Sequence, residues 1–95
     1  MINMSIKEIN LEKSFNKKLG MRGIVKKIFQ DIEGENEVIL NFQGVEFISR
    51  SFAQEYVVQR YDSNISLIEI NMSDFVKNVI DCVDEDYKTN ILGLK

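Results

Sequence analysis

The chain has 95 residues, which is enough for one domain and too few for two. Hydrophobic residues make up 44% of it and charged residues 28%, as in folded globular proteins, which argues against disorder over most of the chain. The net charge of −3 argues against a generic nucleic-acid-binding surface, because phosphate contacts need a surplus of lysine and arginine.

Two residue counts restrict the chemistry further. There is no histidine, which excludes Ser-His-Asp and Cys-His catalysis and the common zinc sites. Cys82 is the only cysteine, so no internal disulfide can form.

The apolar runs are far shorter than the roughly 20 residues that cross a bilayer, and Lys7 and Glu8 stand where a secretory signal would be apolar. We therefore expect a cytoplasmic protein with no membrane partner.

The first third of the chain contains a predicted strand and a predicted helix. Ile6, Ile9 and Leu11 predict a strand over 4–11, and polar residues predict a loop over 12–18. After this loop comes a predicted helix, and Gly34 fits its C-terminal end, where a residue in the left-handed conformation is favoured. That helix is predicted over 21–32 by an apolar stripe at spacings of three and four: Met21, Ile24, Val25, Ile28, Phe29 and Ile32.

Strands and helices continue to alternate after this helix. The apolar run at 38–42 predicts a strand covered on both faces, as in a parallel sheet with helices on each side. The remaining predictions are a packed loop over 44–48, a helix over 52–61, a strand over 65–70 and a helix over 75–83.

This alternation predicts right-handed βαβ units in one small α/β domain that spans 1–95. We expect a mainly parallel or mixed sheet of about four strands, packed with about three helices. Two alternatives remain for the tail, 84–95: a last edge strand or a partly ordered end.

The segment VILNFQGVEFISRSFAQEY, residues 38–56, resembles the STAS-like family of bacterial, archaeal and phage proteins. That family has an apolar strand, an acidic or amide residue, Phe, a Gly-Val loop and a Ser-Phe-Ala helix start followed by an acidic residue. The resemblance extends more weakly to the first predicted helix and to 65–80, and it implies a STAS-like fold. The matching residues are Val38 to Leu40, Asn41, Phe42, Gly44, Val45, Ser51, Phe52, Ala53 and Glu55.

The resemblance also implies a function, through the related STAS domains of anti-sigma factor antagonists. In those domains an ATPase-type serine kinase phosphorylates a serine at the start of the helix, and the matching residue here is Ser51. This chain departs from their pattern at four positions. Ser49 and Arg50 replace an acidic and a small residue, Phe52 replaces glycine, and Asn41 replaces aspartate.

Ser51 therefore has two interpretations. It can be the N-cap of the second helix, with Gln54 as its partner in a Ser-x-x-Gln capping box. It can also be a phosphoacceptor, as the resemblance implies, with the phosphate at the positive end of the helix dipole. Phe52, beside it, is expected to be a core anchor that packs against Phe42 or Phe47.

The favoured hypothesis is a non-enzymatic regulatory module that docks a protein partner through Glu46 to Gln54. The resemblance implies an ATPase-type serine kinase or a related signalling domain as that partner. We find no residue pattern for catalysis, a cofactor or a metal. The partner-binding candidates are Glu46, Ser49, Arg50, Gln54 and Arg22.

Two alternatives belong to other functional classes. The first is a structural or oligomerisation domain of a phage or mobile-element system, which would form a homodimer through sheet edges. The second is a small-molecule-binding domain that uses the carboxyl ends of the strands.

Overall fold

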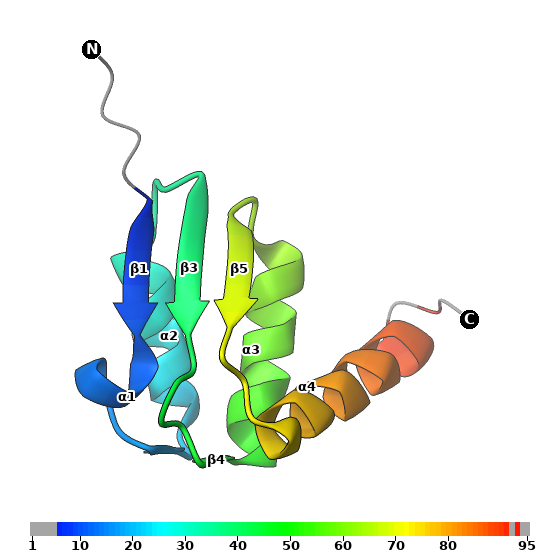
Figure 1. Cartoon of the computed structure of the whole chain (residues 1–95). Helices are drawn as coiled ribbons and strands as arrows, with labels where there is room; N and C mark the ends of the chain where they lie inside the picture. The colour runs from blue at the N-terminus through cyan, green and yellow to red at the C-terminus, as the bar shows by residue number, and fades with distance from the viewer. Residues whose placement is uncertain (1–5, 92, 94–95) are drawn as a thin grey trace.

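The computed structural model describes residues 6–91 and residue 93, which form an α/β fold around a parallel sheet (Figure 1). The sheet contains β1 (Lys7–Asn10), β3 (Glu37–Asn41) and β5 (Ser66–Ile70), in the order β1-β3-β5. Both strand pairs are parallel, with Ile9 beside Leu40 and Leu40 beside Glu69. The α/β prediction is confirmed.

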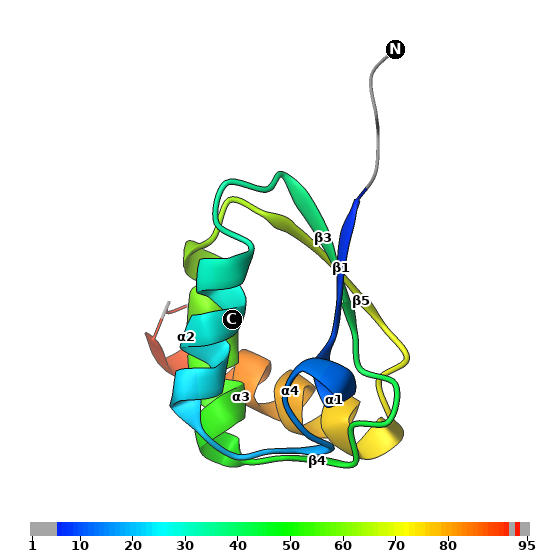
Figure 2. The ribbon, with the colours of Figure 1, turned by 90° about the vertical axis from the view of Figure 1, so that its left-hand side faces the viewer.

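Two helices connect these strands and cover one face of the sheet. α2 (Arg22–Asp31) lies between β1 and β3 in the chain, and α3 (Arg50–Asp62) lies between β3 and β5. Figure 2 shows both helices on the same side of the sheet. The reason is topological: right-handed crossovers that step across a sheet in one direction place their helices on the same face.

The expectation that the sheet is covered on both faces is therefore wrong for the described residues. Their helices leave the second face open, and Ile68 on that face is 37% exposed. Ile39, in the central strand, is half-buried. The apolar run in β3 therefore does not require helices on both faces. On the open face, the neighbouring strands β1 and β5 shield part of its side chains.

The core lies between the sheet and the two covering helices. Val38 and Leu40 of β3 are fully buried there, as are Val25 and Ile28 of α2. α3 contributes its buried side to the same cluster: Phe52, Ala53, Tyr56 and Val57.

The remaining elements lie near the carboxyl end of the sheet. A second, two-stranded parallel sheet joins β2 (Lys18–Leu19) to β4 (Phe47–Ile48). α4 (Asp74–Asp86) begins after β5, with Ser73 as its N-cap, and runs away from the sheet (Figure 1). A π-helical turn, η1 (Tyr87–Ile91), extends it.

Three local expectations are corrected. The predicted loop at 12–18 contains part of a short helix, α1 (Leu11–Ser14), because the side chain of Asn10 caps it by accepting from the amide of Lys13 at 3.0 Å. The edge strand proposed for 84–95 is wrong over 84–91, where α4 and η1 are helical, and 92, 94 and 95 lie outside the described residues. Met21 precedes α2 and is 71% exposed, so it does not belong to the buried stripe.

Candidate functional site

The junction between β4 and α3 is built around Ser49. Its hydroxyl accepts a hydrogen bond from the amide of Phe52 at 3.0 Å and donates one to the carbonyl of Gly20 at 2.8 Å. Ser49 has an extended backbone, and α3 begins at Arg50. The predicted capping box at Ser51 is therefore wrong: Ser51 lies inside the first turn, exposed to solvent.

Phe52 anchors this junction to the core, as predicted from the sequence. It is fully buried, and its ring stacks on that of Tyr56 with 6.2 Å between centroids. The expected ring partners were Phe42 or Phe47. Phe42 instead meets Tyr56 edge-on, also at 6.2 Å, so Tyr56 joins the two phenylalanines.

The amide of Asn41 organises the turn at the end of β3. Its oxygen accepts from the amide of Gln43 at 3.0 Å and from the side chain of Asn71 at 3.1 Å. Its nitrogen donates to the Glu8 carboxylate at 3.0 Å. An aspartate here would place a second carboxylate beside Glu8, which gives a structural reason for the amide.

The other sequence candidates lie around the same junction. Arg50 faces Asp86 of α4 at 3.6 Å, with both side chains more than half exposed. Arg22 donates to Gln54 at 3.3 Å, which links the first turn of α2 to α3. Glu46 is exposed, and only its backbone amide is fixed, by the carbonyl of Lys17 at 2.8 Å.

Two phenylalanines form an exposed aromatic pair beside Arg50. Phe47 of β4 and Phe75 of α4 stack with 5.8 Å between centroids and an interplanar angle of 23°. They are 40% and 49% exposed. A shallow pocket of about 430 Å³ lies beside them, and its lining includes Arg50, Val79 and Cys82. We call Phe47, Arg50, Phe75 and this pocket the aromatic surface.

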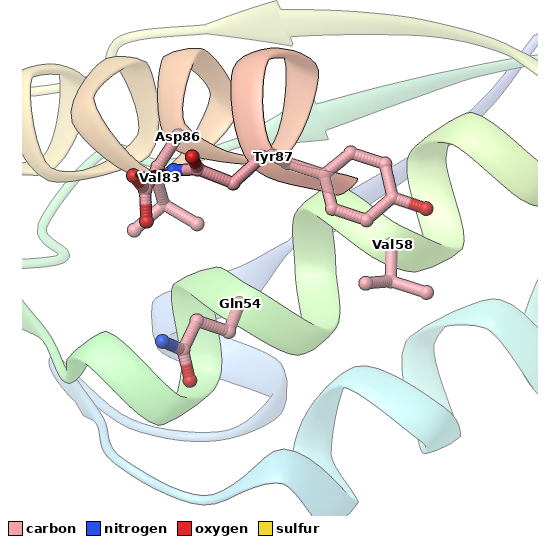
Figure 3. A pocket seen from close by; sticks show the side chains of 6 residues that line it. Gln54, Val58, Val83, Asp86 and Tyr87 are labelled. Carbon is pink, nitrogen blue, oxygen red and sulfur yellow. Dashed lines mark hydrogen bonds between the residues drawn. The ribbon is translucent and has the colours of Figure 1, made fainter. Parts of the chain in front are cut away.

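A second pocket, of about 400 Å³, lies between α3 and the end of α4 (Figure 3). Gln54 and Val58 line it from α3, and Val83, Asp86 and Tyr87 line it from the other side. Arg50 lines the first pocket and its ion-pair partner Asp86 lines the second. The Arg50–Asp86 pair thus links the two pockets.

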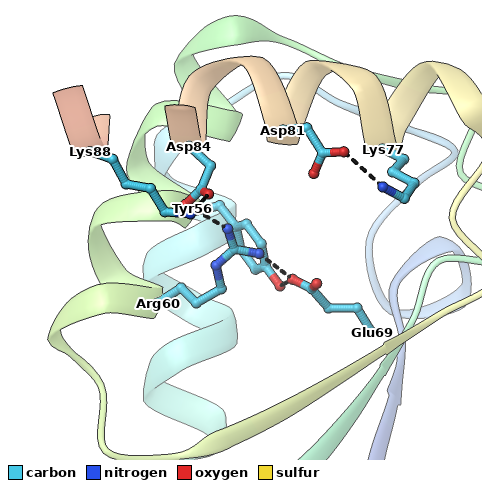
Figure 4. Close-up of polar contacts among 7 residues, drawn as sticks. All are labelled: Tyr56, Arg60, Glu69, Lys77, Asp81, Asp84 and Lys88. Carbon is cyan, nitrogen blue, oxygen red and sulfur yellow. Dashed lines mark hydrogen bonds and ion pairs between the residues drawn. The ribbon is translucent and has the colours of Figure 1, made fainter. Parts of the chain in front are cut away.

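A largely buried polar network holds α3, β5 and α4 together (Figure 4). The Tyr56 hydroxyl donates to the carboxylate of Glu69. Arg60 contacts Glu69 at 2.9 Å and Asp84 at 3.1 Å, and its guanidinium lies 5.5 Å from the centre of the Tyr56 ring. Lys88 reaches Asp84 at 3.1 Å.

The network shifts the pKa values of several of its members, among them Tyr56 and Asp84. Burial raises the pKa of Tyr56 well above its ordinary value of 10.0, and the Glu69 carboxylate adds to that rise. Burial alone would raise the pKa of Asp84. Hydrogen bonds from Lys88 and Tyr61, together with the charge of Arg60, outweigh burial and lower that pKa below 3.8.

Sequence reasoning missed this network because it depends on how α3, β5 and α4 pack together, which no local sequence pattern predicts. Glu69 carries the one available signal, since it is the only charged residue in the apolar strand 65–70. Every buried side-chain nitrogen and oxygen of the described residues has a hydrogen-bond partner, so the network needs no bound ligand to satisfy it.

Comparisons of this chain with protein-family models, with curated proteins and with solved structures found no match. Within 6–91 and 93, no helix combines the length and apolar character needed to span a bilayer. Within the same residues, no cluster of three or more acidic, cysteine or histidine side chains is arranged to hold a metal ion.

Proposed function

We propose that this chain is a non-enzymatic regulatory module that docks a protein partner through the aromatic surface. The observation that carries the proposal is the stacked pair Phe47 and Phe75, which stays exposed although the domain has a well-packed core. Exposed apolar patches on small domains mark interaction sites. Aromatic residues and arginine are the types enriched at the energetic centre of protein interfaces, and Arg50 lies beside the pair.

The second part of the proposal is that phosphorylation of Ser51 controls this docking. Ser51 is exposed and adjacent to Arg50. A phosphate would add about −1.5 to −2 charges there, so it would compete with Asp86 for Arg50 and change the charge of the surface. The resemblance of 38–56 to the STAS-like family supports an ATPase-type serine kinase as the partner that modifies Ser51.

Site-specific photo-crosslinking tests the docking surface. A photoreactive phenylalanine analogue replaces Phe75 in one variant and Glu35, which is exposed on the loop between α2 and β3, in a control variant. In an extract of the native cells, the Phe75 position should crosslink a protein that the Glu35 position does not. Crosslinks that are equal at both positions, or absent from both, would remove the aromatic surface from the interface.

The identified partner then allows a quantitative test with purified proteins. Phe75→Ala should weaken binding roughly 30-fold, the effect of losing an interface hot spot, while Glu35→Ala should leave it unchanged. Mass spectrometry after incubation with the partner and ATP tests the switch. Phosphate should appear on the wild type and on Ser49→Ala, and it should be absent from Ser51→Ala.

Oligomerisation is the second candidate function, and one observation favours it. β1 and β5 are both edge strands of the sheet, and Ile68 of β5 is exposed on its open face. Parallel sheets are usually covered on both faces. Light scattering of the wild type and of Ile68→Glu at several protein concentrations tests this candidate, because assembly through the open face should be lost in the variant.

A further inference from the structure

The two covering helices carry charges that oppose their own dipoles. α2 begins with Arg22 and ends with Asp31, and α3 begins with Arg50 and ends with Asp62, although Arg60 in the last turn of α3 is placed in favour of the dipole. A helix favours acidic residues at its N-terminus and basic residues at its C-terminus. Both helices begin at the carboxyl end of the sheet (Figure 1). The two arginines therefore lie at one end of the molecule, the basic end, and the two aspartates lie at the other, the acidic end.

The acidic end lies where α2 and α3 finish. A pocket of about 240 Å³ lies there, lined by the half-buried Phe29 and Ile65 and by the exposed carboxylates of Glu33 and Asp62. One basic residue, Lys7, also lies at the acidic end, and its amine donates to the carbonyl of Asp31 at 2.7 Å. The exposed acidic residues here are Asp31, Glu33, Glu35, Glu37 and Asp62.

The basic end surrounds the start of α2. Lys17, Lys18 and Arg22 are exposed there, with Glu46 at the margin, where its amide bonds to the Lys17 carbonyl. Met21, 71% exposed, occupies the N-cap of α2 and makes no side-chain capping bond. Serine, threonine, aspartate and asparagine are the residues that stabilise this position. An exposed methionine there leaves the helix start open to acceptors from another molecule.

We propose that the basic end of one copy docks on the acidic end of a second copy. Met21 enters the pocket beside Phe29 and Ile65 of the second copy, and Arg22 meets its Glu33 and Asp62. The carboxylates of the second copy approach the uncapped amides of α2, and successive helix dipoles align head to tail. This contact goes beyond the proposed docking function, since it uses neither the Phe47–Phe75 pair nor Ser51.

The two contacting surfaces differ, so the association is heterologous and extends into open chains or closed rings. Only the end of a small domain is buried, and its attraction is largely between exposed charges. The association is therefore weak and falls as salt rises.

Charge reversal at each end tests the proposal. The basic-end variant is Lys18→Glu with Arg22→Glu, and the acidic-end variant is Glu33→Lys with Asp62→Lys. In sedimentation at low ionic strength, the mass of the wild type should rise above 11.0 kDa with concentration and return to it at about 1 M salt. Each variant alone should stay monomeric. An equimolar mixture should associate again, because the intact basic end of one variant meets the intact acidic end of the other.

Two further variants remove the alternative explanations. Lys27→Glu with Lys77→Glu changes the net charge as much as the basic-end variant, but on the exposed sides of α2 and α4, and should associate like the wild type. Met21→Ser should raise the melting temperature by supplying an N-cap while it weakens association several-fold. A wild type that stays at 11.0 kDa, a mixture that stays monomeric, or Met21→Ser that associates normally would overturn the proposal. Lys18 is the β2 neighbour of Phe47, so crosslinking from Phe75 in the Met21→Ser variant, which keeps Lys18, tests the docking surface separately.

Discussion

The guanidinium of Arg60 lies 3.1 Å from the carboxylate of Asp84, and this ion pair fastens α4 to α3 where both side chains are largely shielded from water. Arg60 also contacts Glu69, so one side chain ties two elements to α3. The aromatic surface depends on this arrangement, because α4 supplies Phe75 and β4 supplies Phe47.

Asp84→Asn should therefore destabilise the fold, by about 1–3 kcal/mol, since Arg60 and Lys88 both lose a charged acceptor. The folded-state pKa of Asp84 is lowered, so its contribution is complete above the ordinary value of 3.8 and is lost as pH falls through the lower folded-state value. Urea unfolding over a series of acidic pH values measures both effects. Asp81→Asn, which removes an exposed partner of Lys77, should cost less than 1 kcal/mol; an equal cost would contradict the role of the network.

Ser49→Ala should cost about 1–2 kcal/mol, because it removes the cap of α3 and the bond to Gly20. Ser51→Ala should change stability by less than about 0.5 kcal/mol, since Ser51 is exposed within the first turn. Thermal unfolding of the two variants makes the comparison. A larger loss at Ser51 would mean that α3 begins two residues later.

Asn41→Asp should destabilise the fold at neutral pH by about 1–3 kcal/mol, because the new carboxylate faces Glu8 where an amide donor lay. The loss should shrink at acidic pH, when a proton shared by the two carboxylates restores a hydrogen bond. Chemical unfolding at neutral and acidic pH tests this. Asn16→Asp is the control, since its exposed side chain only accepts a bond from the next amide, and a similar pH dependence there would rule out this explanation.

Phe52→Ala should cost about 3–5 kcal/mol, since the side chain is fully buried and stacked on Tyr56. Phe75→Ala, which removes a ring of the same size from an exposed position, should cost less than about 1 kcal/mol. Melting temperatures compare the two directly. A large loss at Phe75 would show that its ring supports the fold rather than a docking surface.

The elements that the sequence predicts correctly are those with strong local patterns. α2 follows from its apolar spacing and from Gly34, which has the left-handed φ of +89° that the stop requires. β3 and β5 follow from short apolar runs. α1 has four residues and was missed, because a helix of one turn is too short to show periodicity.

The site is harder to predict because its geometry depends on contacts between distant residues. Ser49 and Ser51 are both of a residue type that favours a helix N-cap. Ser49 takes that position, and its hydroxyl also donates to the carbonyl of Gly20, 29 residues away. The Phe47–Phe75 pair likewise requires α4 to lie beside β4. Sequence spacing alone gives neither relationship.

The strand register has a consequence for how the chain folds. Val38 of β3 pairs with Lys7 of β1 and with Leu67 of β5, each about thirty residues away along the chain. Each pairing therefore closes a long loop before any sheet contact stabilises it, whereas α2 and α3 form from contacts three or four residues apart. The helices are expected to gain structure first and the sheet to assemble onto them, so the central strand sets the folding rate.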